Sequence, residues 1–273
     1  MNEPRKPSAS HSGKSEDFPW WLATIVLIGG FLGWQVVTDE LYLNILTTLS
    51  KGVQLTVFVT LVSFTLASLL GLALAVAAGS RWLIIRQTAR FYVEVVRGIP
   101  IIVLLLYVAF VLAPALVDLR NWIGGHLGLD PIRTRNFPLL WRAIIALMIA
   151  YSAFISEVFR AGLQSVDEGQ IEAAKALGLS RWHRFRFIVF PQAIRTILPP
   201  LGNDFVALVK DSSLVSVLGV ADVTQLGKLM AVGNFRYFET YNVVALIYLT
   251  LTIGLSLALR RLEKHLRRRQ ERG

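Results

Sequence analysis

The sequence of 273 residues contains no cysteine and only four histidines. The lack of cysteine excludes disulfide frameworks, thiolate metal sites, cysteine nucleophiles and iron–sulfur clusters. The histidines show none of the spacings of zinc ligands, because they are His11, His126, His183 and His265. Charged side chains are also scarce, at 17% of the residues, against about 25% in soluble domains. The chain therefore lacks the composition of a soluble globular domain.

Apolar residues are abundant, at 54% of the sequence, and the mean hydropathy is +0.55. Four stretches contain no Asp, Glu, Lys or Arg, namely 18–38, 52–80, 98–117 and 240–259. Each is close to the ~20 residues that span hydrocarbon. Arg142 interrupts a fifth stretch, and Asp204, Lys210 and Asp211 interrupt a sixth. Because the runs are continuously apolar rather than alternating with a period of two, they predict helices and not barrel strands.

We therefore expect an all-α integral membrane protein with a six-transmembrane-helix bundle. The helices should lie at about 20–37, 52–79, 95–114, 138–159, 196–220 and 239–259. No small-residue cleavage site follows the first of them, so we interpret it as a retained helix and not as a signal peptide. Six helices enclose little volume, which favours a translocation path between two copies or two paralogues.

The distribution of Lys and Arg predicts the orientation. They number 19 in the segments 1–19, 80–90, 160–195 and 260–273, and six in the segments 38–51, 114–137 and 221–236. Cytoplasmic loops carry the excess of Lys and Arg, so both termini should be cytoplasmic, with 1–19 a disordered tail and 263–273 a basic tail. The net charge of +10 is then mainly a topology signal, and no nucleic-acid partner is expected.

Small residues recur every four positions along the second expected helix, at Ser63, Ala67, Gly71, Ala75 and Gly79. Such a face lets two helix backbones approach closely inside a membrane. We favour packing within the chain over a subunit interface as the reason for this pattern.

The segment 162–191, between the fourth and fifth expected helices, has the signals of a helical hairpin outside the membrane. Ser165 to Glu168 form a capping-box pattern, and strong helix formers follow. Gly178 suits a left-handed helix stop. Ser180 can cap a second short helix over 181–189, and Pro191 marks the start of the next span. The pattern alone also allows an amphipathic pair lying on lipid headgroups.

This hairpin resembles the EAA loop of bacterial ABC-importer permeases. The matching residues, in the family's spacing, are Glu172, Ala173, Ala174, Gly178, Ile188, Phe190 and Pro191, with Phe190 where Leu is common. Further segments resemble the polar amino-acid uptake branch of that family: Glu94 with Arg97-Gly98-Ile99-Pro100, Ser156 to Gly162, Gly169-Gln170, Leu198-Pro199 with Gly202-Asn203, and Lys210 to Leu214. The similarity covers about 52–262, and the extra first helix departs from five-helix members.

The resemblance implies a type I importer core of five helices plus one N-terminal helix at 20–37, in the bacterial inner membrane. It implies a dimer of permease subunits, alike or different, that opens alternately to either side. A periplasmic receptor would deliver a polar amino acid. A cytoplasmic ABC ATPase dimer would use ATP and magnesium, so this chain would bind no cofactor or metal and would not be an enzyme.

The resemblance also suggests roles for individual residues. The ATPase-subunit interface would comprise Gly169, Glu172, Ala173, Ala174, Leu177, Gly178, Ser180, Arg184 and Pro191, with Glu172 as a polar anchor and the two alanines in close contact. Candidate gate or pore residues are Asn203, Asp204, Lys210, Asp211, Ser212 and Ser213. Candidate structural or translocation residues are Arg97, Gly98, Pro100, Glu157 and Arg160.

The charged residues within the spans have two interpretations. Asp204 and Asp211 share a helical face because they are seven residues apart, and they either hold polar substrate or form structural pairs. The i, i+3 pairs Glu94/Arg97 and Glu157/Arg160 favour structural pairing. Two rivals to amino-acid import are import of another derivative, such as an opine or cystine, and an adaptor that anchors an ATPase. A membrane enzyme is disfavoured because no reactive constellation is present.

Overall fold

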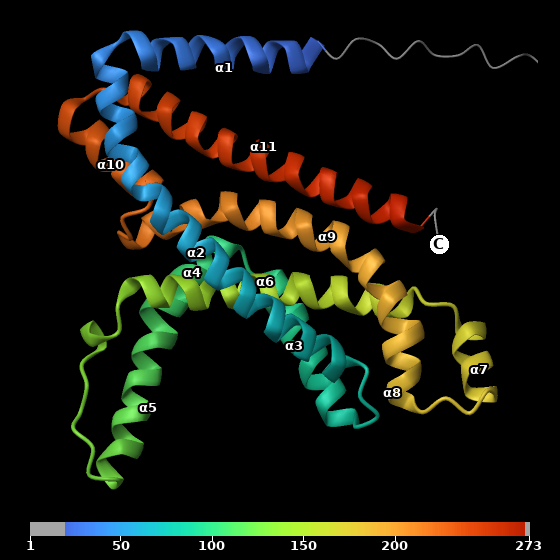
Figure 1. Ribbon diagram of the computed structural model, residues 1–273. Coiled ribbons are helices and arrows are strands. Elements are labelled where there is room, and N and C mark those ends of the chain that lie inside the picture. The colour runs from blue at the N-terminus through green and yellow to red at the C-terminus, as the bar shows by residue number, and fades with distance from the viewer. Residues whose placement is uncertain (1–19, 271–273) are drawn as a thin grey trace, which may run out of the picture.

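The computed structural model describes residues 20–270, and every regular element in that part of the chain is helical (Figure 1). In chain order the elements are α1 (Trp20–Thr38), α2 (Glu40–Ala78), α3 (Leu83–Gly98), α4 (Ile101–Tyr107), the π-helical turn η1 (Val108–Leu112), α5 (Ala113–His126), the 3-10 turn η2 (Thr134–Asn136), α6 (Leu139–Gln164), α7 (Glu168–Ala176), α8 (Arg181–Arg184), the π-helical turn η3 (Phe185–Val189), α9 (Phe190–Asp211), the 3-10 helix η4 (Ser212–Leu218), α10 (Val223–Asn234) and α11 (Tyr237–Gln270). The all-α class is confirmed, and the expected tail 1–19 lies outside the described residues.

The expected count of six spanning helices is not confirmed. Among the described residues, four helices are long and apolar enough to cross a membrane: Glu40–Ala78, Ile101–His126, Leu139–Gln164 and Tyr237–Leu262. The expected first span forms α1, but its apolar part, Val26–Thr38, is shorter than the length needed to cross a membrane. The expected fifth span is α9, which turns into the 3-10 helix η4 after Asp211. Its three charged residues lower its hydropathy.

Several expected helix ends are wrong for local reasons. The second helix begins at Glu40 rather than near 52, because the Asp39 carboxylate accepts a hydrogen bond from the Leu41 amide at 2.8 Å and caps it. The third expected span, 95–114, is divided. Helix α3 ends at Gly98 because Pro100 disfavours a helical backbone at the preceding residue, Ile99 (φ −100°, ψ 129°), and a new helix starts after Pro100.

Helices α2 and α6 form the centre of the structure. The predicted small-residue face is buried at Ser63, Ala67, Gly71 and Ala75. A side chain on Gly71 would place its Cβ 3.0 Å from the Ser152 carbonyl oxygen, so the two backbones are nearly in contact. The Ser63 hydroxyl donates across the same contact to the Ile144 carbonyl at 3.4 Å. The face therefore serves packing within the chain, as expected.

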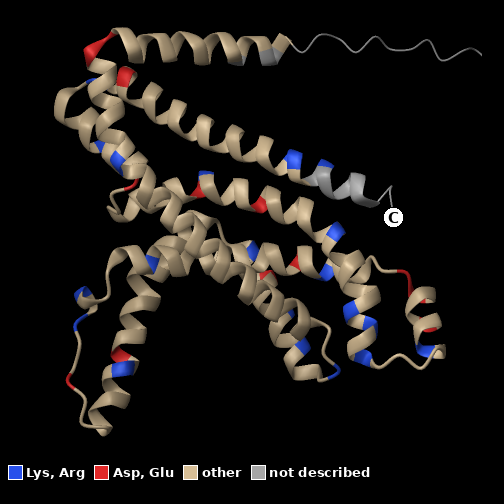
Figure 2. Ribbon diagram, viewed as in Figure 1, with Lys and Arg blue, Asp and Glu red and all other residues tan. Residues whose placement is uncertain are grey.

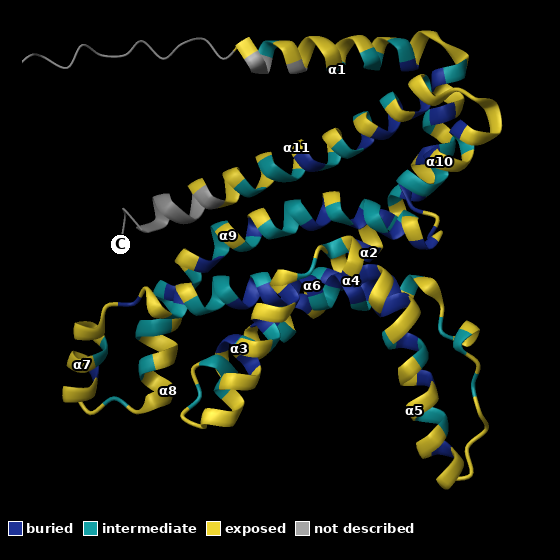
Figure 3. Ribbon diagram, turned by 180° about the vertical axis from the view of Figure 1, so that it is seen from behind, coloured by how far each residue is buried: buried dark blue, intermediate teal, exposed yellow. Residues whose placement is uncertain are grey.

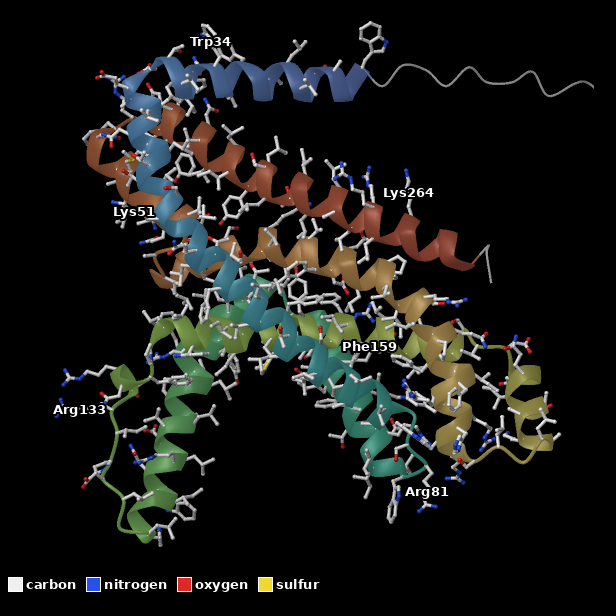
Figure 4. The ribbon with its side chains drawn as sticks, viewed as in Figure 1. Trp34, Lys51, Arg81, Arg133, Phe159 and Lys264 are labelled. Carbon is white, nitrogen blue, oxygen red and sulfur yellow. The ribbon has the colours of Figure 1, made fainter. Side chains whose placement is uncertain are left out.

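The loops that the charge count assigns to opposite sides lie at opposite ends of the molecule. Lys51 and Arg133 lie at one end, whereas Arg81 and Lys264 lie toward the other (Figure 4). The α7–α8 hairpin shares the end of Arg81 and Lys264, and α10 lies at the end of Lys51 (Figure 1). Figure 2 shows Lys and Arg gathered on α8 and at the start of α9.

A buried polar cluster attaches α10 to α2 and α11 at the end opposite the hairpin. The Asp222 carboxylate is fully buried and accepts hydrogen bonds from the Gln225 amide at 2.8 Å and the Tyr248 hydroxyl at 3.0 Å. Burial raises the pKa of this carboxyl above its ordinary value. Gly52 permits the close approach, since a Cβ there would lie 2.6 Å from the Val223 nitrogen. These contacts fix the start of α10.

The α2–α6 contact predicts the effect of enlarging Gly71. Replacing it with leucine should destabilise the fold by about 1–3 kcal/mol or more, because the facing atoms include backbone that cannot move aside. The measurement is thermal unfolding of the purified protein in detergent. The matched control is Gly254→Leu in α11, where nothing lies within 4 Å of the position that a Cβ would take. Equal melting temperatures for the two variants would contradict the packing argument.

Candidate functional site

The α7–α8 hairpin begins with a cap on Asp167. The Asp167 carboxylate accepts a hydrogen bond from the Gln170 amide at 3.1 Å, which satisfies a free donor of the first turn. The expected capping box with Ser165 as the cap is wrong. The Ser165 hydroxyl instead donates to the Gly162 carbonyl at 2.8 Å and contacts the Thr196 hydroxyl at 3.1 Å. Ser165 therefore joins the end of α6 to α9.

Helix α7 ends in a Schellman motif at Gly178, as the sequence predicts. Gly178 has φ +73°, and its amide donates to the Lys175 carbonyl at 3.0 Å. The Leu179 amide donates to the Ala174 carbonyl at 3.1 Å. Together these two bonds satisfy carbonyls that the helix end would otherwise leave free. The turn between α7 and α8 thus has a defined conformation.

The second half of the hairpin is continuous with α9. Ser180 caps α8 as predicted, and its hydroxyl accepts from the His183 amide at 3.4 Å. The chain then passes through the π-helical turn η3 into α9 without a break. Pro191 is the second residue of α9 and directly follows the π-helical turn η3. The hairpin is therefore a direct extension of a helix in the bundle.

The base of the hairpin is packed tightly against α6 and α9. Val166, Ala193 and Ile197 form a small buried cluster there. Gly162 in α6 lies so close to the Ile197 side chain that any Cβ would collide with it. The Gln192 amide group also donates to the Gln170 side-chain oxygen at 2.6 Å, which ties α9 to α7. These contacts make the hairpin and its two supporting helix ends a single packed unit.

The predicted interface residues divide between the outer and inner sides of the hairpin. Glu172, Ala173 and Leu177 are exposed, with Leu177 at 81% of its full exposure. Ala174 is 1% exposed and packs inward, so its expected role in close contact with a partner is corrected to internal packing. Exposed residues of the hairpin also include Gly169, Gly178 and Ser180, and Arg184 is half-buried. Much of the α7–α8 hairpin is exposed (Figure 3).

Sequence reasoning did not single out the aromatic side chains on this surface. Trp182 and Phe187 are 65% and 67% exposed beside the arginines of α8 and η3. Exposed large aromatic residues next to arginine are typical of protein–protein interfaces. Their alternation with Arg181, Arg184 and Arg186 in the sequence was an available signal.

The two expected ion pairs have different outcomes. Arg160 and Glu157 form an ion pair, and Arg160 also donates to the Gln164 side chain at 3.0 Å. In the described part of the chain Glu94 and Arg97 form no ion pair. The Arg97 guanidinium instead lies 6.0 Å from the centre of the Phe154 ring. Gly98 has nothing within 4 Å of a Cβ position, and Pro100 occupies the N-cap position of α4 without a side-chain capping bond.

The polar residues of α9 are not held together by ion pairs. Asp211 accepts a hydrogen bond from the Tyr151 hydroxyl at 2.7 Å, and Lys210 is exposed. One oxygen of Asp204 is buried without a hydrogen-bond partner in the described structure, and Asn203 is exposed. Ser212 and Ser213 start the 3-10 helix η4, and the Ser212 hydroxyl donates to the Val209 carbonyl at 2.8 Å. The partner of Asp211 is thus a tyrosine that sequence reasoning missed.

Arg142 is a second residue whose role the sequence did not reveal. It is only 6% exposed and donates to the carbonyls of Ala109 at 3.0 Å, Phe137 at 2.9 Å and Thr134. In the π-helical turn η1 the Ala113 amide bonds the Val108 carbonyl, five residues back. With the same spacing of five residues, the Ala109 carbonyl would accept from the amide of residue 114. That residue is Pro114, which has no N–H. Arg142 supplies the missing donor.

Together these features define a helical membrane protein with a capped helical hairpin at one end. The chain matches the family described as binding-protein-dependent transport system inner membrane component over residues 67–272. It is 36% identical over 219 residues to the glutamine transport system permease protein GlnP of Escherichia coli (strain K12), a match covering 80% of this chain and 93% of that relative. The chain belongs to this family of transporter permeases.

Solved structures have the same fold. A structure described as an amino acid ABC transporter with histidines is 35% identical, with a TM-score of 0.68 over 80% of this chain and 94% of the other. The methionine ABC transporter MetNI, in an inward-facing conformation, has a TM-score of 0.61 at 22% identity, over 80% of this chain and 95% of the other. Because its sequence identity is low, the similarity to MetNI supports the fold and nothing further.

The contacts of Arg142 predict a large effect of removing its charge. Arg142→Met should lower the melting temperature of the detergent-purified protein, because the buried Ala109 carbonyl loses its donor at a cost of about 1–3 kcal/mol, and the half-buried carbonyls of Phe137 and Thr134 lose theirs as well. Arg133→Met, on a surface loop of the same region, should leave the melting temperature unchanged. If Arg142→Met unfolds at the wild-type temperature, the carbonyls find other donors and this account is wrong.

Proposed function

We propose that this chain is the membrane-spanning permease subunit of an ATP-driven importer that moves polar amino acids into the cytoplasm by alternating access. The observation that carries the proposal is the α7–α8 hairpin, which is capped at Asp167, closed at Gly178 and anchored to α6 and α9. A rigid helix transmits a displacement, whereas a flexible Gly/Ser loop would absorb it. Amino-acid substrates are supported by the relatives, which are described as glutamine and amino-acid transporters.

The partners follow from the same proposal. A cytoplasmic ABC ATPase subunit binds and hydrolyses ATP with magnesium, and it contacts the exposed side of the hairpin at Glu172, Ala173 and Leu177. This chain performs transport without covalent chemistry and binds no cofactor. It pairs with a second permease subunit, either a copy of itself or a paralogue. A periplasmic receptor delivers the amino acid at the end of the molecule that carries α10 (Figure 1).

The proposed orientation places both termini and the hairpin in the cytoplasm of a cell with an inner membrane. The excess of Lys and Arg in the segments at the hairpin end supports this orientation. The separation of Lys51 and Arg133 from Arg81 and Lys264 is consistent with it (Figure 4).

The coupling role predicts the effect of reversing the charge of Glu172. Glu172→Lys should lower amino-acid-stimulated ATP hydrolysis and uptake by about tenfold or more, because an exposed anchor for the ATPase is replaced by a repelling charge. The measurement uses proteoliposomes that contain this chain with its candidate ATPase subunit and receptor, to which amino acids are added one at a time. The control is Glu40→Lys, at the other end of the molecule. Unchanged ATPase association and uptake in Glu172→Lys would refute the coupling role.

The proposed orientation can be tested because the chain has no cysteine of its own. Single cysteines at Lys51 and Arg133 should react with a membrane-impermeant maleimide in cells whose outer membrane is opened. Cysteines at Arg81 and Lys264 should react only after the inner membrane is permeabilised. All four positions are exposed, so burial does not limit the reaction. The opposite labelling pattern would show that the orientation is inverted.

A further inference from the structure

A polar cleft of about 470 Å³ lies where the end of α2, helix α3 and the end of α6 meet. This is the end of the molecule that carries the α7–α8 hairpin (Figure 1). The residues that line it include Gly79, Arg90, Glu94, Ser156, Glu157 and Arg160. Its volume is within the range of about 300–1,000 Å³ that is usual for small-molecule sites.

The charges in the cleft are of two kinds. Glu157 and Arg160 bond to each other, and Arg160 also bonds to Gln164. These two charges are therefore already compensated. Arg90 and Glu94 line the cleft from α3, and in the described structure neither has an ion-pair or side-chain hydrogen-bond partner. The cleft thus contains, among its described residues, one free cation and one free anion.

Arg90 and Glu94 lie one helical turn apart, on the same face of α3. They could have bonded to each other, but an acid that follows a base along the helix is the less favourable order for an i, i+4 pair. Their unpaired side chains place opposite charges on one helix face that lines the cleft. A ligand that carries a carboxylate beside an ammonium group complements this arrangement.

We propose that the cleft binds the α-carboxylate and α-ammonium groups of a free amino acid at the end of the molecule from which substrate is released. Arg90 binds the carboxylate, because a guanidinium presents two parallel donors that match its two oxygens. Glu94 accepts from the ammonium group. The side chain of the amino acid takes no part in this recognition. The inference rests on the proposed function, since it assumes that the hairpin end faces the cytoplasm.

The test measures binding of radiolabelled L-glutamine to the full chain in nanodiscs of phosphatidylcholine and phosphatidylglycerol. Competing ligands are N-acetyl-L-glutamine, which lacks the ammonium group, and L-glutamine α-amide, which lacks the carboxylate. Wild type should bind both analogues at least about tenfold more weakly than glutamine, because each loses a charged hydrogen bond. Because the site recognises only the α-groups, L-histidine should compete as well as glutamine.

Two variants assign the groups, and both positions are exposed, so the fold is expected to tolerate them. Glu94→Gln should weaken glutamine binding about tenfold and remove the preference over N-acetyl-L-glutamine. Arg90→Gln should weaken it similarly and remove the preference over the α-amide. Arg81→Gln is the control, because Arg81 lies at the same end of the molecule but outside the cleft lining.

Each other outcome overturns the site. The site is excluded if the wild-type protein does not bind glutamine. It is also excluded if Glu94→Gln and Arg90→Gln bind glutamine as tightly as the wild-type protein does. Phosphatidylethanolamine carries an ammonium group beside a phosphate. If glutamine binding is lost in nanodiscs that contain this lipid, the cleft is a site for a lipid headgroup instead. The proposed function is tested separately by uptake in proteoliposomes. Uptake without binding at the cleft would reject only the site, whereas absent uptake of every amino acid would reject the transport function.

Discussion

The structure depends on one constraint, which is that a backbone polar group in apolar surroundings needs an internal partner. Straight helices meet this requirement by themselves, and irregular segments need help from side chains. The π-helical turn before Pro114 is the clearest case, because the Ala109 carbonyl would have no donor there without Arg142. The charge in the fourth expected helix, Arg142, therefore supplies the donor that the π-helical turn in the third expected span requires. A charged residue that interrupts an apolar helix, Arg142 in α6, thus satisfies a backbone carbonyl in the neighbouring helix.

Close backbone approach is the second organising feature. At Gly71 the absence of a side chain brings α2 against α6, and at Gly162 it brings α6 against α9. Inside a membrane no hydrophobic force draws helices together, so their association depends on the close van der Waals packing that small residues allow. The three helices are consequently connected in series, from the middle of the bundle to the base of the hairpin. The hairpin is therefore joined through α9 and α6 to α2 at the centre of the structure.

Much of this architecture could be predicted from periodicity and local stop signals. The apolar runs predicted the positions of the long helices. Gly178 and Ser180 predicted the turn of the hairpin, because each acts on backbone groups close to it in the sequence. The cap at Asp167 was missed because Ser165 fits the same local pattern. The inward position of Ala174 and the partner of Asp211 depend on which helix lies opposite. Such contacts between distant segments leave no periodic signal in a single sequence.

The proline pair in α9 has a mechanical consequence. Pro199 and Pro200 lie inside the helix and leave the carbonyls of Arg195 and Thr196 without their usual ladder donors. On the hairpin side of this pair, Ile197 is wedged against Gly162. On the other side, Asp211 is bonded to Tyr151 of α6. Helix α9 is thus anchored on both sides of the proline pair and lacks two ladder hydrogen bonds there, so a force applied to the hairpin would be converted into bending at this point.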